Sequence, residues 1–148
     1  MDVVSEITHR GGNAKSRQTL KAIAGGKGRT AFQGRIVVAE NAIKTDARQE
    51  CHNLLLDHAG EANVKPELLI FADDVACSHG ATVGEVDAQA LFYLTQRGIP
   101  ENEARGMLVR AFLSDVLDAI PHEAVRAAFE AKVGRWMKKN LGREARHE

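Results

Sequence analysis

The sequence predicts a mainly β fold that is followed by helices, and three observations support this. Short apolar and β-branched segments follow one another through residues 1–86, separated by turns that contain glycine, asparagine, aspartate or proline. In one of these segments, residues 29–39, the residues expected to be buried alternate with residues expected to be exposed, as they do in a half-buried strand. From residue 87 the apolar spacing changes to steps of three and four, which is the helical period.

The β part contains a succession of candidate strands. They cover residues 3–9, 16–24, 29–39, 47–56, 67–72 and 75–83. In the third of them one face is expected to be buried, and it comprises Thr30, Phe32, Gly34, Ile36 and Val38. Strands this frequent fit either a β-sandwich or a stacked coil. The pattern alone favours a sandwich, because sandwiches are common and no crisp short repeat is visible.

Three helices are expected in the remaining residues, 87–148. Asp87 is placed to cap the first and Gly98 to end it, while Pro100 opens the second helix and Pro121 the third. The second helix is expected to bury a stripe of Ala104, Met107, Leu108, Ala111, Phe112, Val116, Ala119 and Ile120. The stripe of the third helix comprises Val125, Ala128, Phe129, Lys132, Val133 and Trp136. The basic end of that helix, which suits the helix macrodipole, is formed by Lys138, Lys139 and Arg143.

Composition narrows the possible functions. The chain has 148 residues, of which 44% are hydrophobic and 27% charged, as in a soluble globular protein. Its 20 basic and 20 acidic residues cancel, so we expect neither nucleic acid nor a membrane as partner. Cys51 and Cys77 are too few for a disulfide framework, and no signal peptide or membrane span is visible. The expected location is the cytoplasm.

Cys77 and His79 form the strongest candidate site. Residues two apart on a strand project from the same face, so the thiol and the imidazole share one space. Both are good ligands for iron and zinc, but two ligands cannot close a tetrahedral site, and the rest would come from another surface, sulfide or solvent. The alternative is an inert core thiol beside a structural histidine. Asp73 is an even number of residues from both and would lie on the same face of an extended strand. It is either a hydrogen-bonding partner of these ligands or a solvated carboxylate in a turn.

Other motifs are weaker. Cys51 and His52 are adjacent, which sends them to opposite faces of a strand and predicts a core thiol at Cys51. The glycine-rich residues 25–30 fail the phosphate-binding loop pattern, because that pattern requires glycine where Lys21 stands and serine or threonine where Gly28 stands. No Ser/His/Asp arrangement has a spacing specific enough for hydrolysis.

Two stretches carry a resemblance to a known family. ADDVACSHGATVG at residues 72–84, followed by ALFYLTQRGI at 90–99, closely resembles the C-terminal part of the SufB/SufD family of iron–sulfur cluster assembly scaffold proteins. GRIVVAENAIKTDARQECHNLLLD at 34–57 resembles the same family. The CSHG motif is similar to the SufD branch rather than to the SufB branch. Family members are much longer, so the resemblance implies a fragment or a truncated form.

The resemblance replaces the sandwich with another fold. It implies that residues 1–86 are the terminal coils of a right-handed parallel β-helix and that residues 87–148 are a C-terminal helical domain. It also implies a non-catalytic scaffold subunit that acts with SufB and the ATPase SufC in building and transferring nascent clusters. Such a subunit holds no cofactor tightly by itself and carries an iron–sulfur cluster only transiently in the complex.

The resemblance further implies particular site residues. His79 matches a histidine implicated in nascent cluster assembly together with a cysteine of SufB, and Cys77 matches a motif cysteine with weaker support. The family docks SufC on its helical domain, which implies partner contacts at Leu91, Phe92, Tyr93, Arg97, Met107 and Phe112. Members pair with SufB, or with themselves, through β-helix edges, so a homodimer is expected for this chain alone.

Two other functions remain open on the sequence. The chain could be a pure interaction module that binds SufC and partner β edges, with His79 in a structural role. It could also be a small redox or metal enzyme that uses Cys77.

Overall fold

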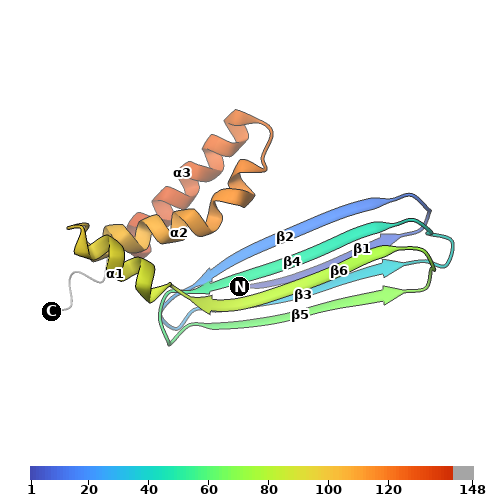
Figure 1. Cartoon of the computed structure of the whole chain (residues 1–148), viewed down its shortest axis with the longest axis horizontal. Helices are drawn as coiled ribbons and strands as arrows, with labels where there is room; N and C mark the ends of the chain where they lie inside the picture. Colours follow the sequence, from blue (N-terminus) through green and yellow to red (C-terminus); the bar gives the residue numbers. More distant parts are fainter. Residues whose placement is uncertain (142–148) are drawn as a thin grey trace. The chain divides into compact units, whose positions relative to one another are not determined.

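The computed structural model describes residues 1–141 of the chain. The chain divides into two compact units, Met1–Glu85 and Val86–Glu148, and each is described by itself. The first unit consists of strands β1 (Asp2–His9), β2 (Lys15–Ala24), β3 (Arg29–Val38), β4 (Asp46–Leu55), β5 (Glu61–Ile70) and β6 (Ala76–Glu85) (Figure 1). The second unit contains helices α1 (Ala88–Gln96), α2 (Glu101–Asp118) and α3 (Glu123–Asn140).

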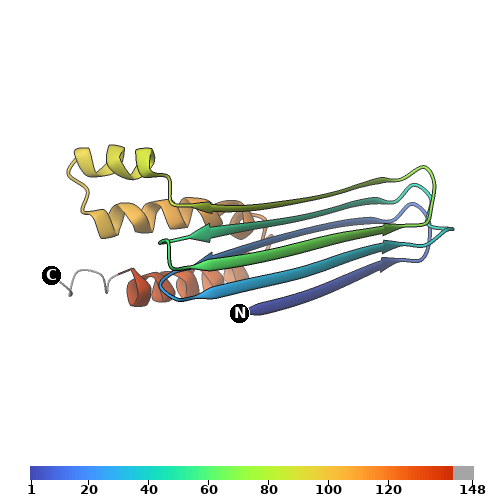
Figure 2. The same ribbon diagram turned by 90° about the horizontal axis from the view of Figure 1, so that it is seen from below.

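The strands form two parallel sheets that face each other. One sheet has the order β1-β3-β5 and the other β2-β4-β6, so the chain alternates between the sheets (Figure 2). Each strand pairs with the strand two further along, with Asp2 beside Ala31 and Lys15 beside Asp46. The first unit is therefore a short parallel β-helix, as the family resemblance predicts. The sandwich favoured by the sequence pattern alone is wrong, because sandwich sheets are built from antiparallel strands.

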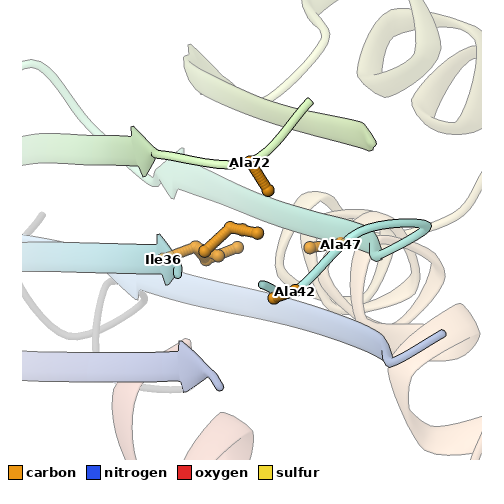
Figure 3. Close-up of a cluster of buried hydrophobic side chains, with 5 residues drawn as sticks. Ile36, Ala42, Ala47 and Ala72 are labelled. Atoms are coloured by element: carbon orange, nitrogen blue, oxygen red, sulfur yellow. The ribbon is translucent and has the colours of Figure 1, made fainter. Parts of the chain in front are cut away.

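The core lies between the two sheets in the middle coil. Thr30, Phe32, Gly34, Ile36 and Val38 of β3 are all buried, which confirms the alternation predicted for this strand. The two largest apolar side chains of one core group, those of Ile36 and Val38, pack against small side chains near the ends of the strands. Figure 3 shows this core group, which comprises Ile36, Val38, Ala42, Ala47 and Ala72. Burial is most complete here because the middle coil has a neighbouring coil on each side.

One corner of each coil repeats the same backbone conformation. Asn13, Lys44 and Asp74 all have positive φ angles, of 56°, 57° and 54°, and each precedes an even-numbered strand. The corners are joined by backbone hydrogen bonds, from the Lys44 amide to the Asp74 carbonyl and from the Asn13 amide to the Ile43 carbonyl, both 2.8 Å. The backbone ladder of the sheets thus continues through this corner, which fixes where β6 begins.

The fifth strand begins earlier than the sequence pattern predicts. The pattern places it at residues 67–72 and a turn around Pro66, but β5 runs from Glu61. The Glu61 amide donates to the carbonyl of Gly28, just before β3, and the Phe71 amide donates to that of Val38. The backbone groups of residues of opposite parity, including Pro66, therefore point away from β3. Among the described strands β5 pairs with β3 alone, so proline removes no donor that this sheet uses.

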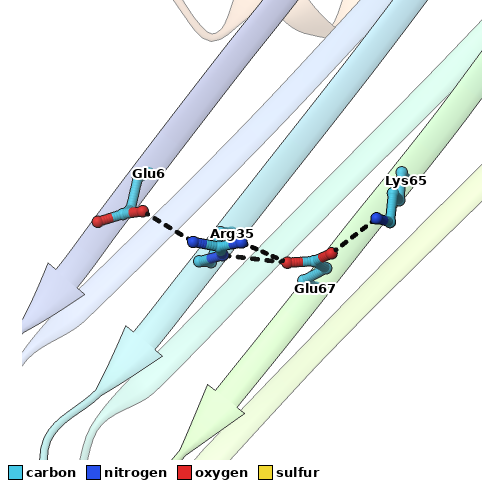
Figure 4. Close-up of polar contacts among 4 residues, drawn as sticks. All are labelled: Glu6, Arg35, Lys65 and Glu67. Carbon is cyan, nitrogen blue, oxygen red and sulfur yellow. Dashed lines mark hydrogen bonds and ion pairs between the residues drawn. The ribbon is translucent and has the colours of Figure 1, made fainter.

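Charged side chains line the outer face of the β1-β3-β5 sheet. Arg35 lies between Glu6 and Glu67, which are its register neighbours on β1 and β5 (Figure 4). Its Nε and Nη2 atoms are each 3.0 Å from Glu67 Oε2, and Lys65 Nζ lies 3.2 Å from Glu67 Oε1. Arg35 and then Lys65 lower the pKa of the Glu67 carboxyl. This face is solvated and does not contribute to the candidate site.

The helix ends follow the sequence closely. Asp87 Oδ1 accepts hydrogen bonds from the amides of Gln89 and Ala90, at 2.8 and 3.1 Å, and so caps α1 as predicted. Gly98 has a φ of +83°, and its amide and that of Ile99 bond back to the last turn of α1. This is the left-handed termination that was predicted at Gly98.

The stripes predicted to be buried in α2 and α3 are only partly right. Ala104 is buried as predicted, but Met107 is exposed and Val109, which lies off the stripe, is buried. Most of the α3 stripe is exposed, and burial is confined to Met137 near its end and to Leu141, which follows the helix. The reason is that in the described part of this unit each helix is covered only on the side that meets its neighbouring helix. The predicted basic end lies partly at Lys138 and Lys139, while Arg143 falls outside the described residues.

Candidate functional site

Cys77 and His79 both lie on β6 and point to the same side, as the sequence predicts. β6 is parallel to β4, with Cys77 beside Ala47 and His79 beside Gln49. Ala47 and Gln49 are completely buried, so their face of the sheet is the one turned towards the interior of the β-helix. Because residues in register on neighbouring strands share a face, the thiol and the imidazole project from the inner face of the last coil.

The two side chains differ in how far they are covered. Cys77 is half-buried and packs against the core group, whereas His79 is exposed. Among the described strands β6 pairs only with β4, and the Ala76 amide donates to the Thr45 carbonyl of the turn before β4. Residues of the opposite parity, including Cys77 and His79, therefore direct their backbone N–H and C=O groups to the open edge of the sheet. The candidate site thus combines a thiol and an imidazole, two potential metal ligands, with a strand edge that can accept a further strand.

The interior behind this site is polar, which sequence reasoning missed. Gln49 Nε2 donates to Gln18 Oε1 at 2.6 Å, and Gln18 Nε2 donates to Ser5 Oγ. Nearer the other end of the same strands, Thr30 Oγ1 donates to Asn53 Oδ1 at 3.0 Å. Gln18, Gln49 and His79 occupy the same position in successive coils, which only the spacing of about thirty residues per coil could have indicated.

Cys51 is the core thiol that the sequence predicts. It is completely buried on β4, while the adjacent His52 faces outward and bonds to Thr82 Oγ1 at 2.8 Å. Burial raises the pKa of the Cys51 thiol, although the hydrogen bond from Asn53 Nδ2, at 3.4 Å, opposes this. Cys51 is therefore held as a neutral thiol away from the Cys77 position.

The two cysteines should react differently with a thiol reagent. In the folded chain, an aromatic disulfide reagent is expected to modify Cys77 and to leave Cys51 unmodified, because only Cys77 is partly accessible. Absorbance of the released thiolate measures this directly, and both cysteines should react after denaturation. A Cys77→Ser chain is the matched control and should release almost nothing while folded. Rapid modification of Cys51 in that control would contradict the burial described here.

The structure shows how far these residues alone could hold a metal. Within residues 1–141 no group of three or more His, Cys, Asp and Glu side chains is arranged around a common point. Asp73 lies exposed in the turn before β6, next to the left-handed Asp74, and not on the strand itself. Cys77 and His79 could therefore supply two ligands on one face, and other ligands would have to come from outside the described residues.

The comparison with known proteins identifies the family. Residues 1–112 match the family model described as "SUF system FeS cluster assembly, SufBD core domain". The chain belongs to the SufBD family. The iron-sulfur cluster assembly protein SufD of Escherichia coli (strain K12) is 42% identical over 133 residues, which is 90% of this chain and 31% of that protein.

Other SufBD relatives show the same partial coverage. SufD of Bacillus subtilis (strain 168) is 36% identical over 107 residues, covering 72% of this chain and 24% of that protein. A SufBD family protein of Synechocystis is 38% identical over 120 residues, covering 81% of the chain and 26% of the relative. The chain thus spans a quarter to a third of the length of these relatives. Within residues 1–141 no helix has the length and apolar character needed to cross a membrane.

The SufBD-type helices present apolar side chains to solvent. On α1, Phe92 and Tyr93 are 64% and 56% exposed, and the Arg97 guanidinium lies 4.4 Å from the centre of the Tyr93 ring. Leu91 is half-buried, as is Phe112 on α2, so these two are less available than the sequence suggests. Met107 is exposed and lines a groove of about 440 Å³ between α2 and α3. The rest of the groove is lined by Asn102, Glu103, Gly106, Arg110, Gly134, Met137, Lys138 and Leu141.

Proposed function

We propose that this chain acts as a SufD-like scaffold subunit in iron–sulfur cluster assembly, in the cytoplasm, without catalysis of its own. It works with SufB and the ATPase SufC, and the nascent cluster is its cargo. The observation that carries the proposal is the placement of Cys77 and His79 on the inner face of β6, at an open sheet edge, in a chain of the SufBD family.

The chemistry of this pair suits a cargo that must arrive and leave. Thiolate and imidazole both bind iron, and an incomplete ligand set leaves positions for sulfide and for ligands from another subunit. Because Cys77 and His79 also lie on an open edge, a strand from SufB that adds there would come within reach of both. We therefore assign His79 the role of a cluster ligand or of a proton carrier during cluster assembly. Cys77 is assigned an auxiliary role.

The helical unit is the proposed contact for SufC. Its exposed apolar residues include Phe92 and Tyr93 on α1 and Met107 on α2, and an exposed apolar patch on a small folded unit is characteristic of a protein interface. The groove at Met107 adds a concave surface with charged residues at its rim, among them Glu103 and Arg110. Movement of the ATPase would reach the β-helix through this unit and change access to His79.

A charge placed in this surface should weaken SufC binding. Met107→Asp is expected to lower the affinity of the chain for SufC at least tenfold, measured by titration calorimetry, because it buries a charge at the contact. Val125→Asp is the matched control, since Val125 and Met107 are both 45% exposed on helices. The control should leave binding unchanged. Equal affinity of the Met107 variant, with unchanged circular dichroism, would place the SufC contact elsewhere.

A pure interaction module is the second candidate, and the exposed Phe92 and Tyr93 favour it. In that case the chain would bind SufC and pair with SufB, or with a second copy of itself, through open strand edges, while His79 had no part in the chemistry. Co-expression with SufB and SufC distinguishes the two functions. Both require a complex that contains all three chains, but only the scaffold function requires that cluster content depend on His79.

A further inference from the structure

We propose that Gln49 is a positioning residue for His79, and this rests on the function proposed above. Its side-chain oxygen accepts a hydrogen bond from one ring nitrogen of His79. This hydrogen bond selects one tautomer of the imidazole, in which the lone pair of the other nitrogen is turned away from the core and available to the cargo.

The starting observation is an unsatisfied atom in the middle of the β-helix. Gln49 is completely buried, and its Nε2 donates to Gln18 Oε1. Its Oε1 atom is also buried and has no hydrogen-bond partner among the described residues. A buried carbonyl without a partner costs about 1–3 kcal/mol, so natural structures rarely keep one unless a donor reaches it in some state.

His79 is the register neighbour of Gln49 on β6 and carries an N–H group. Gln18, Gln49 and His79 are register neighbours on β2, β4 and β6, and all three project from the inner face. Adjacent strands lie about 4.8 Å apart, so an imidazole beside Gln49 can reach the Gln49 amide by a change of rotamer. Ala47 and Cys51, the inward neighbours of Gln49 on β4, offer no comparable donor.

The facing strand is shaped to let the amide occupy this position. Gly34 of β3 lies opposite Gln49, and a Cβ atom there would be 2.5 Å from Gln49 Nε2 and 2.6 Å from Oε1. Any other residue at position 34 would collide with the amide or displace it. The Gln49 side chain is thus confined, and its oxygen has little freedom to move to another hydrogen-bond donor.

The direction of the hydrogen bonds determines what His79 must provide. Gln49 donates to Gln18, and Gln18 donates to Ser5, so each amide directs its donor towards the first coil. The Gln49 oxygen that is left over is an acceptor and needs an N–H or O–H donor, and the ring of its register neighbour His79 can supply an N–H group. A histidine that donates from one nitrogen presents a lone pair on the other, which is how such partners orient metal-binding histidines.

The tautomer of His79 can be read without any cluster. In the full chain labelled with ¹⁵N, long-range proton–nitrogen correlation spectra should show one dominant neutral tautomer for His79. A peptide of residues 75–82 provides the unconstrained mixture for comparison. Gln49→Met, which removes the acceptor, is expected to shift His79 to that mixture. A mixture in the wild-type chain, or a single tautomer that persists in Gln49→Met, would overturn the proposal.

Two variants separate positioning from general damage. Asn53→Leu removes a different buried amide from β4, beside Val83 rather than His79, and should leave the tautomer unchanged. Gln49→Glu keeps an acceptor oxygen and should preserve the single tautomer. If Gln49→Met does not fold, the wild-type spectrum still decides, because a mixture there is incompatible with the proposal.

The same variants separate this proposal from the function on which it rests. In the complex with SufB and SufC, Gln49→Met is expected to slow cluster formation about tenfold, as loss of a partner that orients a ligand does. Gln49→Glu should restore much of the rate. If clusters form normally without His79, the proposed function fails while the tautomer result stands. If His79 is required but Gln49→Met forms clusters at the wild-type rate, only the role of Gln49 fails.

Discussion

The His79→Ala chain is expected to join SufB and SufC in the normal complex and to leave that complex without an iron–sulfur cluster. The imidazole is exposed on the inner face of β6 and makes none of the core contacts, so its removal takes away a ligand and little stability. The free energy of unfolding should fall by only about 1 kcal/mol, the usual net contribution of one hydrogen bond such as that proposed from His79 to Gln49. Iron and acid-labile sulfide per complex measure the first effect, and urea denaturation measures the second.

Two further substitutions on β6 serve as controls for His79. Ser78→Ala changes the residue between Cys77 and His79, whose side chain points to the outer face, and should leave cluster content unchanged. Cys77→Ser should lower cluster content less than His79→Ala does, because we assign the thiol an auxiliary role. If the complex with alanine at position 79 assembles clusters at the wild-type rate, the histidine is structural and the interaction-module function is the better one.

Ile36→Ala is expected to destabilise the β-helix by about 3 kcal/mol, the usual cost of emptying a fully buried aliphatic site. Ile36 is completely buried and is among the largest side chains of the core group. The cavity cannot easily collapse, because many of the side chains around it are alanines on two paired sheets that have little room to move inward. Urea denaturation followed by the β-sheet circular dichroism signal measures the loss.

The matched control for Ile36 is another aliphatic residue in the same sheet. Val4 on β1 is 77% exposed, so Val4→Ala should change the free energy of unfolding by no more than about 0.5 kcal/mol. Similar losses for the two variants would mean that the interior between the sheets is not the main source of stability.

Much of the local structure could be predicted from the sequence because it depends on neighbouring residues. The buried face of β3 follows from side chains that alternate along a strand, and the ends of α1 follow from Asp87 and Gly98. The shared face of Cys77 and His79 is the same kind of prediction, since it requires only that β6 be extended. These inferences need no knowledge of which strands pair.

Features that depend on pairing could not be predicted in this way. The row formed by Gln18, Gln49 and His79 exists only because the strands stack in a particular register, and no short motif marks it. The start of β5 was missed because Pro66 normally breaks a strand and is tolerated here by an open edge. The exposed stripe of α3 was assigned to a core because a helical period cannot distinguish an apolar face that is buried from one that is exposed.

The most direct test asks whether a histidine nitrogen of this chain touches the cluster. The complex would be assembled from unlabelled SufB and SufC with this chain labelled with ¹⁵N at histidine only. The reduced cluster would then be examined by electron–nuclear double resonance. The account predicts a ¹⁵N coupling to the cluster in the wild-type complex, whereas the His79→Ala complex should give no cluster signal. A paramagnetic cluster without such a coupling, or with one that survives the substitution, would contradict the assignment of His79 as a ligand.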